Sequence, residues 1–276
     1  MSVREPYFAD DRWYPSSPDT LTKAVGGYVG SKCGQSVVAV VSPHAGYYYS
    51  GHVAGAVYGQ IAVPDRVVLL GVNHRGIGSS QAIVTQGYWR IPGRDVPIDT
   101  EAAQRIQTLV PELIEDTEAH RAEHSLELQL PFLVYQNPNV RIVPLVLGRV
   151  GLQQCQRLGK AIAEILPTLS GETLLVASTD LNHHENASVG NAKDSHAMAA
   201  IERLDPQGLL HAVRTHGISM CGVMPTLATL YAARVLGAKH GTLIRYADSG
   251  DVSGDKSSVV GYAGMVLTKS VFGGMT

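Results

Sequence analysis

Three stretches of the chain share one pattern, in which a run of apolar, largely β-branched residues is followed directly by polar residues that include a histidine. The runs, with the polar residues that follow them, are 37–41 with His44, 66–72 with His74, and 173–178 with Asp180 and His183. Uninterrupted apolar runs of this length are typical of strands buried on both faces of a sheet. Helices must then cover both faces, so the pattern favours an α/β fold.

The histidines are placed where such folds bind ligands, because ligands of open α/β sheets lie at the carboxyl ends of the strands. Pro43 ends the first run by removing a backbone donor, and Gly46 allows a sharp turn, so His44 stands at a strand end. One such histidine is more often a hydrogen-bonded structural residue than a ligand. Three of them after equivalent strands, one near Asp180, indicate a shared pocket.

Helical patterns alternate with strands along the rest of the chain. We expect helices over 18–28, 50–60, 152–166, 192–201, 205–213 and 225–236, and further strands over 81–85, 140–147, 242–246 and 258–267. This alternation predicts a three-layer α/β/α sandwich around a mostly parallel or mixed sheet. No linker rich in Gly, Ser and Pro divides the 276 residues, so we expect a single domain over 1–276.

Some segments give weaker signals. The tyrosines at 47–49 could line a pocket or form a packed turn, and 87–99 is expected to be irregular. A helix that begins near residue 99 should bury Ile106 and Leu109. The stretch 123–132 predicts a helix kinked near Pro131, with His124 and Glu127 on one face. Taken alone, that face is best interpreted as a solvated polar surface.

Composition limits the classes of function. The net charge of −2 argues against a general surface for nucleic acid or an anionic membrane. The first residues contain no signal peptide, and no apolar stretch is long enough to span a membrane. The three cysteines have no paired spacing, so a disulfide framework is not expected and a reducing cytoplasm fits best.

The polar residues at the strand ends suit metal chemistry. The candidate donors are His44, His74, His124, Asp180, His183 and Cys221. Two imidazoles with a third protein ligand and open positions are typical of catalytic zinc or iron(II) sites. Two histidines, a cysteine and a nearby methionine also resemble a blue-copper set, which we discount because those sites use small β-scaffolds.

Cys221 precedes the helix expected over 225–236. A helix N-terminus lowers the pKa of a thiol, so we expect a thiolate at neutral pH. In the metal-free protein, Cys221 should then react with iodoacetamide faster than Cys33 or Cys155. A thiolate with two imidazoles would favour Fe(II), Cu(I) or Zn over Mg or Ca.

Six motifs in this order resemble the Memo family, also called AmmeMemoRadiSam system protein B. They are PHAGYYYSG at 43–51, GVNH at 71–74, EHSLELQLPF at 123–132, STDLNH at 178–183, MCG at 220–222 and SGDVSGD at 249–255. The resemblance covers nearly the whole chain. One departure is Asp10 and Asp11, where a small Ala-Gly pair would be expected, a change that could reshape the rim of a pocket.

The resemblance implies a fold similar to the class III extradiol dioxygenases, whose non-haem iron(II) cleaves catechol-type rings. Carried over by motif, the metal ligands would be His44, His74 and Cys221. Asp180 and His183 would be the neighbouring acid–base pair. His124 would line the same pocket. Cys221 stands where the ring-cleaving dioxygenases have a carboxylate.

The resemblance therefore implies a cytoplasmic, metal-binding oxidoreductase that uses Fe(II) and O₂ on an oxygenated aromatic or related small molecule, with Cu or Zn as other metals. His183, oriented by Asp180, would deprotonate the substrate. Two other interpretations stay open: a non-catalytic metal- or peptide-binding protein of the family, and a metal-dependent hydrolase. The sequence also leaves a homo-oligomer open.

Overall fold

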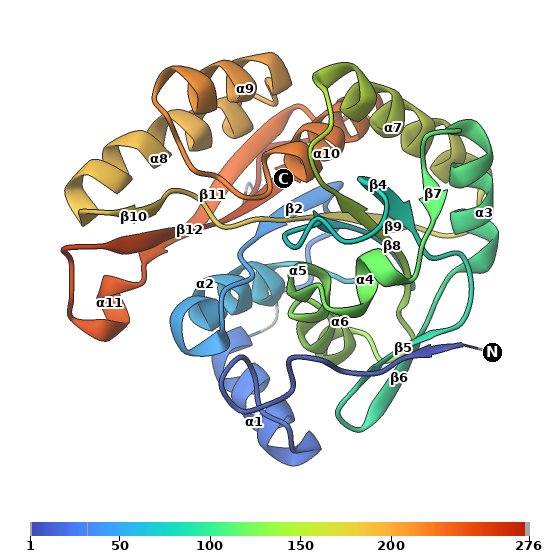
Figure 1. Ribbon diagram of the computed structural model, residues 1–276, viewed down its shortest axis with the longest axis horizontal. Helices are drawn as coiled ribbons and strands as arrows, with labels where there is room; N and C mark the ends of the chain where they lie inside the picture. The colour runs from blue at the N-terminus through green and yellow to red at the C-terminus, as the bar shows by residue number, and fades with distance from the viewer. Residues whose placement is uncertain (1, 32, 274–276) are drawn as a thin grey trace.

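A nine-stranded mixed sheet lies at the centre of the computed structural model, which describes residues 2–31 and 33–273 (Figure 1). Four neighbouring strands are parallel, in the order β2 (Ala39–Ser42), β9 (Thr173–Ser178), β3 (Arg66–Val72) and β8 (Arg141–Leu147). The remaining strands are β12 (Val259–Thr268), β11 (His240–Asp248) and β10 (His183–Glu185) beyond β2, and β4 (Gln81–Ile83) and β7 (Ile114–Glu115) beyond β8. Residues 1, 32 and 274–276 of the predicted 1–276 domain lie outside the described residues, and its single-domain organisation stays a prediction.

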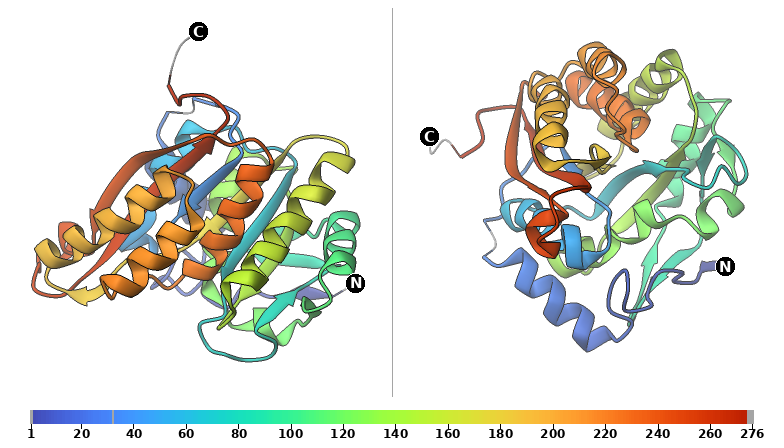
Figure 2. Two further views of the ribbon diagram at one scale, coloured as in Figure 1. Left: turned by 90° about the horizontal axis from the view of Figure 1, so that it is seen from above. Right: turned by 60° about the vertical axis from the view of Figure 1, so that its left-hand side comes forward.

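Helices cover both faces of this sheet, which confirms the predicted α/β/α sandwich (Figures 1 and 2). One face carries α7 (Leu152–Ile165), α8 (Ala187–Glu202), α9 (Pro206–Thr215) and α10 (Val223–Val235), with α3 (Thr100–Leu109) beside α7. The other carries α1 (Pro18–Val29), α2 (Tyr47–Gln60), α5 (His124–Glu127) and α6 (Leu130–Gln136). The short helices are α4 (Glu118–Arg121), η1 (Leu166–Thr168) and α11 (Gly250–Ser253). No described helix has the length and apolarity needed to cross a membrane.

The parallel strands at the centre determine where the polar residues meet. Every residue of β2 and β3 is buried, as expected for strands with helices on both faces. Because β2, β3 and β9 are parallel, their carboxyl ends lie at one edge of the sheet. His44, His74 and Asp180 follow these ends and therefore converge at that edge.

The sequence suggested that the segment 87–99 is irregular, but the structure shows regular strands there. The segment forms a hairpin of β5 (Tyr88–Ile91) and β6 (Arg94–Pro97), and the N-terminal β1 (Val3–Arg4) pairs with β5. Side chains alternate between buried and half-buried along β5, and this alternation outweighs the flanking prolines. Gly93 supplies the left-handed backbone that the tight turn requires, with φ of 79°.

Two helix predictions also need correction. α2 begins at Tyr47 rather than at residue 50, so the tyrosines at 47–49 form its first turn and not a separate turn. Tyr47 is buried, whereas Tyr48 and Tyr49 are exposed. In α3 Ile106 is buried as predicted, but Leu109 is 43% exposed because the helix ends there.

The segment 123–132 forms α5 and the start of α6 in place of one kinked helix. Pro131 lies in the first turn of α6, where its missing N–H disturbs no intrahelical hydrogen bond. Glu127 is fully buried, so the prediction of a solvated face is wrong. Its carboxylate accepts hydrogen bonds from the Arg4 guanidinium, the Tyr14 hydroxyl and the backbone of 7–8, and so fixes the N-terminal arm (residues 2–17).

Replacing this carboxylate should destabilise the protein. We expect Glu127→Ala to lower the free energy of unfolding by about 3–5 kcal/mol, because it leaves the Arg4 charge and the Tyr14 hydroxyl without their buried partner. Urea unfolding measures the change. Glu112→Ala, which breaks an exposed pair with Arg157, is the control and should leave stability nearly unchanged. A similar loss in both variants would contradict a special role for Glu127.

Candidate functional site

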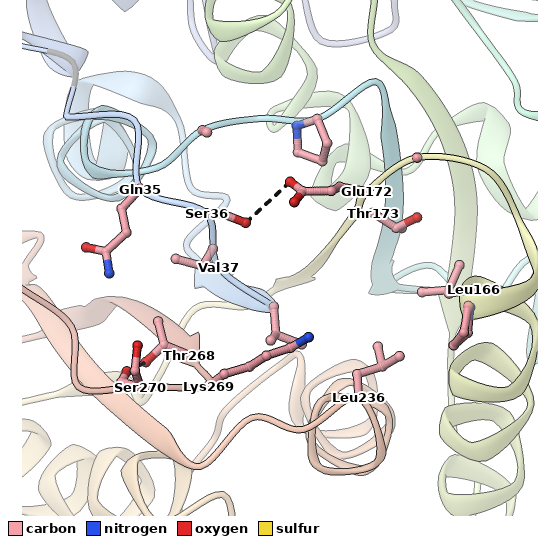
Figure 3. A pocket seen from close by; sticks show the side chains of 15 residues that line it. Gln35, Ser36, Val37, Leu166, Glu172, Thr173, Leu236, Thr268, Lys269 and Ser270 are labelled. Carbon is pink, nitrogen blue, oxygen red and sulfur yellow. Dashed lines mark hydrogen bonds between the residues drawn. The ribbon is translucent and has the colours of Figure 1, made fainter. Parts of the chain in front are cut away.

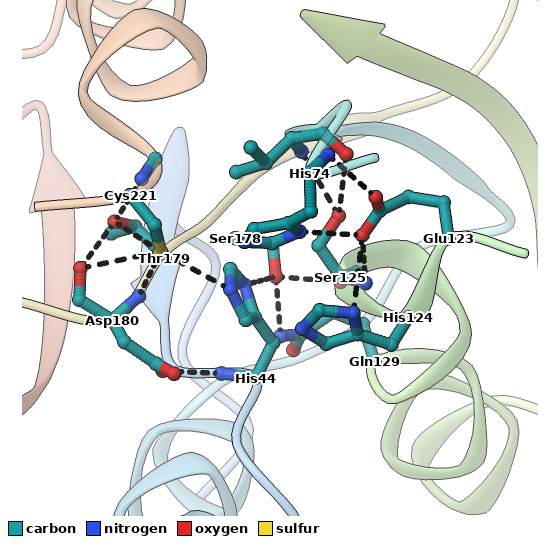
Figure 4. A network of polar contacts seen from close by, with 12 residues as sticks. His44, His74, Glu123, His124, Ser125, Gln129, Ser178, Thr179, Asp180 and Cys221 are labelled. Atoms are coloured by element: carbon teal, nitrogen blue, oxygen red, sulfur yellow. Dashed lines mark hydrogen bonds and ion pairs between the residues drawn. The ribbon is translucent and has the colours of Figure 1, made fainter. Parts of the chain in front are cut away.

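The Ser178 hydroxyl determines which nitrogen of His44 carries the proton. Its Oγ donates to the carbonyl of Ser125 (2.6 Å) and accepts the amide of Gln129 (2.8 Å), whose orientation is fixed because it also donates to the Pro43 carbonyl. His44 Nδ1 lies 2.9 Å from the same oxygen and must therefore donate to it (Figure 4). The unprotonated Nε2 of His44 then remains free as a ligand atom.

Glu123 has the same effect on His74. Its Oε1 lies 2.9 Å from His74 Nδ1, and its Oε2 accepts the His74 backbone N–H. Burial alone would raise the pKa of Glu123, but the His74 hydrogen bond and the nearby imidazoles lower it to about 2. The ionised carboxylate accepts the proton on Nδ1 and leaves Nε2 of His74 free.

Cys221 completes a possible ligand set with these two imidazoles. Its Sγ lies 3.3 Å from Nε2 of His44 and accepts the backbone N–H of Asp180 at 3.3 Å. Ligand atoms of His44, His74 and Cys221 all lie within 4.8 Å of one another. Two imidazole nitrogens and a sulfur at this spacing fit a borderline or soft first-row metal ion.

The structure does not support a thiolate at Cys221 in the metal-free protein. Burial, and then the negative charge of Asp180, raise the pKa of the thiol. Cys221 lies one residue before Gly222, the N-cap of α10, and therefore outside the helix. The effect of burial on the thiol pKa outweighs that of the helix dipole there. We therefore no longer expect Cys221 to react quickly with iodoacetamide in the metal-free protein; a raised thiol pKa makes the reaction slow.

No hydrogen bond joins the described side chains of Asp180 and His183, the two residues expected to be a neighbouring acid–base pair. Asp180 Oδ1 accepts the backbone N–H of His44 at 2.8 Å, so this carboxylate fixes the His44 loop. Burial raises the pKa of Asp180, although the His44 N–H and the nearby His183 charge oppose the shift. His183 Nδ1 is buried and has no hydrogen-bond partner among the described residues.

His124 joins the site to the N-terminal arm. Its ring stacks on His74, with centroids 4.4 Å apart, and lies 4.7 Å from Trp13 and 5.5 Å from Phe8. Burial, and then the His44 charge, lower the pKa of His124 to about 3, so the ring is neutral. His124 and Glu123 form a second possible ligand group with His74.

The two aspartates that depart from the family pattern shape the arm beside this ring. Asp10 accepts the backbone N–H of Trp13 at 3.2 Å, and Asp11 accepts that of Ser16 at 2.8 Å. Neither carboxylate contributes to the two possible ligand groups found among the described residues. Of the two, Asp10 contacts Trp13 directly and helps to position it beside His124.

Sequence reasoning missed the residues that orient the ligands. Glu123, Ser178 and Gln129 were seen only as letters of motifs. Glu123 caps α5 by accepting the N–H of Ser125, but glutamate is not among the residues preferred at this position, so the sequence carried no clear signal for it. No pattern in the sequence pairs Ser178 with His44, because this contact joins two separate strands.

A cavity of about 360 Å³ lies at the opposite edge of the sheet, near the amino ends of β2 and β9 (Figure 3). Ser36, Glu172 and Lys269 are among the side chains that line it. It contains none of the predicted site residues, so the chemistry proposed for the chain belongs to the other edge.

The fold and the clustered imidazoles and thiol define an α/β protein with a candidate metal site. A family model described as Memo-like protein matches residues 4–266. A MEMO1 family protein of Methanopyrus kandleri is 39% identical over 273 residues, covering 94% of this chain and 96% of the relative. One from Aquifex aeolicus is 37% identical over 270 residues, covering 97% and 100%. The chain therefore belongs to the Memo family.

A solved structure shows the same fold at low sequence similarity. The crystal structure of an uncharacterized protein from Escherichia coli K12 matches with a TM-score of 0.55 at 14% identity. The match covers 82% of this chain and 99% of that one. This likeness supports the architecture and carries no information about activity.

The half-buried thiol of Cys221 gives a direct test of the metal-free site. In metal-free protein, iodoacetamide should label exposed Cys33 fastest, while Cys221 and buried Cys155 stay slow through pH 9, because their raised pKa values keep them protonated. Labelling of Cys221 should increase only as the pH rises further. Peptide mass spectrometry gives the three rates. Fast labelling of Cys221 at pH 7 would show that it is a thiolate after all.

Proposed function

We propose that the protein binds a redox-active metal ion, Fe(II) first, through His44, His74 and Cys221. The observation that carries this proposal is the convergence of one ring nitrogen from each of His44 and His74 with the Sγ atom of Cys221, all within 4.8 Å of one another. Both imidazoles are already in the tautomer that a metal ligand needs, because Ser178 and Glu123 accept the protons of the other nitrogens. This preparation is typical of metal sites.

The ligand types restrict the choice of metal. A sulfur donor is soft and imidazole is borderline, so Mg and Ca are disfavoured, and Fe(II), Cu(I) or Zn fit. Iron bound there would supply sites for O₂ and for a substrate oxygen. We therefore propose an extradiol-dioxygenase-like oxidation of an oxygenated aromatic or related small molecule, carried out in the cytoplasm.

The side chains around the ligands have distinct roles in this proposal. His183 accepts a substrate proton, and Asp180 fixes the His44 loop. The uncharged ring of His124 and the ring of Trp13 together form a wall that excludes water from the site. The missing Asp180–His183 hydrogen bond favours a second candidate, a protein of this family that binds the metal without turnover.

The ligand assignment predicts a loss of metal. His44→Ala and His74→Ala should each abolish stoichiometric Fe(II) binding without unfolding the protein, because both residues lie beyond the strand ends and outside the hydrophobic core cluster. Elemental analysis of anaerobically loaded protein measures the loss. Cys221→Ser should weaken binding strongly, whereas Cys155→Ser, buried on α7, should not. Full occupancy in both histidine variants would refute the assignment.

The acid–base assignment predicts a loss of turnover with metal retained. His183→Gln should still bind Fe(II) but should lower O₂ uptake with catechol-type substrates by roughly 10²-fold or more, the usual contribution of a proton-transfer group. Asp180→Asn should also retain the metal, because its amide oxygen can still accept the His44 N–H, and should lower O₂ uptake. An oxygen electrode measures uptake. If wild-type protein consumes no O₂ with any such compound, the non-catalytic candidate replaces the enzyme.

A further inference from the structure

A cavity of about 370 Å³ lies beside His74 and carries two arginines. Asn73, His74, Arg75, Ser80 and Arg149 are among the residues that line it, and no Asp or Glu does. His74 also belongs to the candidate metal site, so the cavity and that site share a wall. A ligand at the metal could therefore extend into this cavity.

Neither guanidinium group is paired with an acid of the described residues. Arg75 and Arg149 are exposed and make no hydrogen bond or ion pair with any residue of 2–31 or 33–273. By contrast, Arg66 at the other end of β3 is paired with Asp99 at 2.7 Å. Two uncompensated positive charges in one cavity of a chain whose net charge is −2 create a local attraction for anions.

Arg75 is held with its donors free. Its Cζ lies 5.6 Å from the centroid of the Tyr7 ring, on the N-terminal arm. A cation–π contact of this kind uses none of the guanidinium N–H groups and leaves them available. Those N–H groups match the geometry of a carboxylate or a phosphate.

The loop that follows Arg75 has a defined shape. Asn73 Nδ2 donates to the carbonyls of Ile77 at 2.8 Å and Ser79 at 3.3 Å. Gly76 and Gly78 adopt φ of 62° and 68°, a conformation that other residues rarely take. The cavity wall is thus formed before any ligand arrives.

Carboxylates near the cavity are already engaged. Asp116 accepts the N–H of Ser79 at 2.7 Å and those of Glu118 and Ala119, so backbone donors compensate its charge. Glu123 is bonded to His74. Neither acid forms an ion pair with the two arginines, whose charges are left for a ligand.

We propose that Arg75 and Arg149 bind the carboxylate or phosphate group of a small organic anion whose other end reaches the metal ligands. The anion site itself needs only the cavity and the two guanidinium groups. The part of the proposal that places the reactive end at His44, His74 and Cys221 rests on the proposed function. The substrate class is then an oxygenated small molecule with one anionic group.

Binding of simple probes to metal-free protein tests the anion site without coordination to metal. We expect benzoate or phenyl phosphate to bind about tenfold more tightly than neutral benzyl alcohol in calorimetric titrations. Arg75→Gln and Arg149→Gln should each weaken the anion by about three- to tenfold, and the double variant should lose the preference over benzyl alcohol. The tighter of the two anions identifies the group, carboxylate or phosphate.

Arg214→Gln is the matched control, because Arg214 is exposed on α9, outside the cavity and without an ion pair. It should bind the probes as wild type does. The proposal is wrong if the cavity variants bind the anions as tightly as wild type, if benzyl alcohol binds equally well, or if no anion binds saturably. Fe(II) content of every variant is measured in parallel. If the variants bind Fe(II) fully but anion binding does not depend on the arginines, this inference alone is wrong. If anion binding depends on the arginines but the protein takes up no Fe(II), only the proposed function is wrong.

Discussion

The hydrogen bond between Ser178 and His44 is the contact on which the candidate site depends. Ser178 ends β9, His44 follows β2, and the two other partners of the Ser178 hydroxyl, Ser125 and Gln129, come from the segment of α5 and α6. One oxygen thus joins two parallel strands to the helices that cover them. Because all of its hydrogen-bonding capacity is used, the tautomer of His44 cannot change without breaking a buried contact.

The N-terminal arm depends on a second buried polar residue, Glu127, which lies close in sequence to Ser125 and Gln129, two partners of Ser178. Glu127 fixes the arm through Arg4 and Tyr14, and α5 begins only a few residues earlier, at His124. Through this arrangement Trp13 lies against His124. The wall of the site therefore requires the arm to be in place, although the arm contributes no ligand atom to either possible metal group.

The sequence predicted the convergence of histidines because it follows from local rules. Apolar runs indicate buried strands, and parallel strands bring their carboxyl ends to one edge, so His44, His74 and Asp180 had to meet there. The sequence could not predict the partner of Asp180, since its bond to the His44 backbone depends on how two loops pack. The same reason explains the wrong charge state expected for Cys221, whose pKa reflects burial that no local pattern encodes.

Charge on the two sides of the candidate metal site differs in a way that would orient a ligand. Asp180, with the thiol of Cys221, lies on one side of His44, and the unpaired Arg75 and Arg149 lie in the cavity beyond His74. An anionic group is attracted by the guanidiniums, so a ligand with one charged end would place that end in this cavity. The two imidazoles, uncharged when bound to metal, stand between these regions and favour neither end. The orientation of such a ligand would therefore depend on residues outside the candidate ligand set.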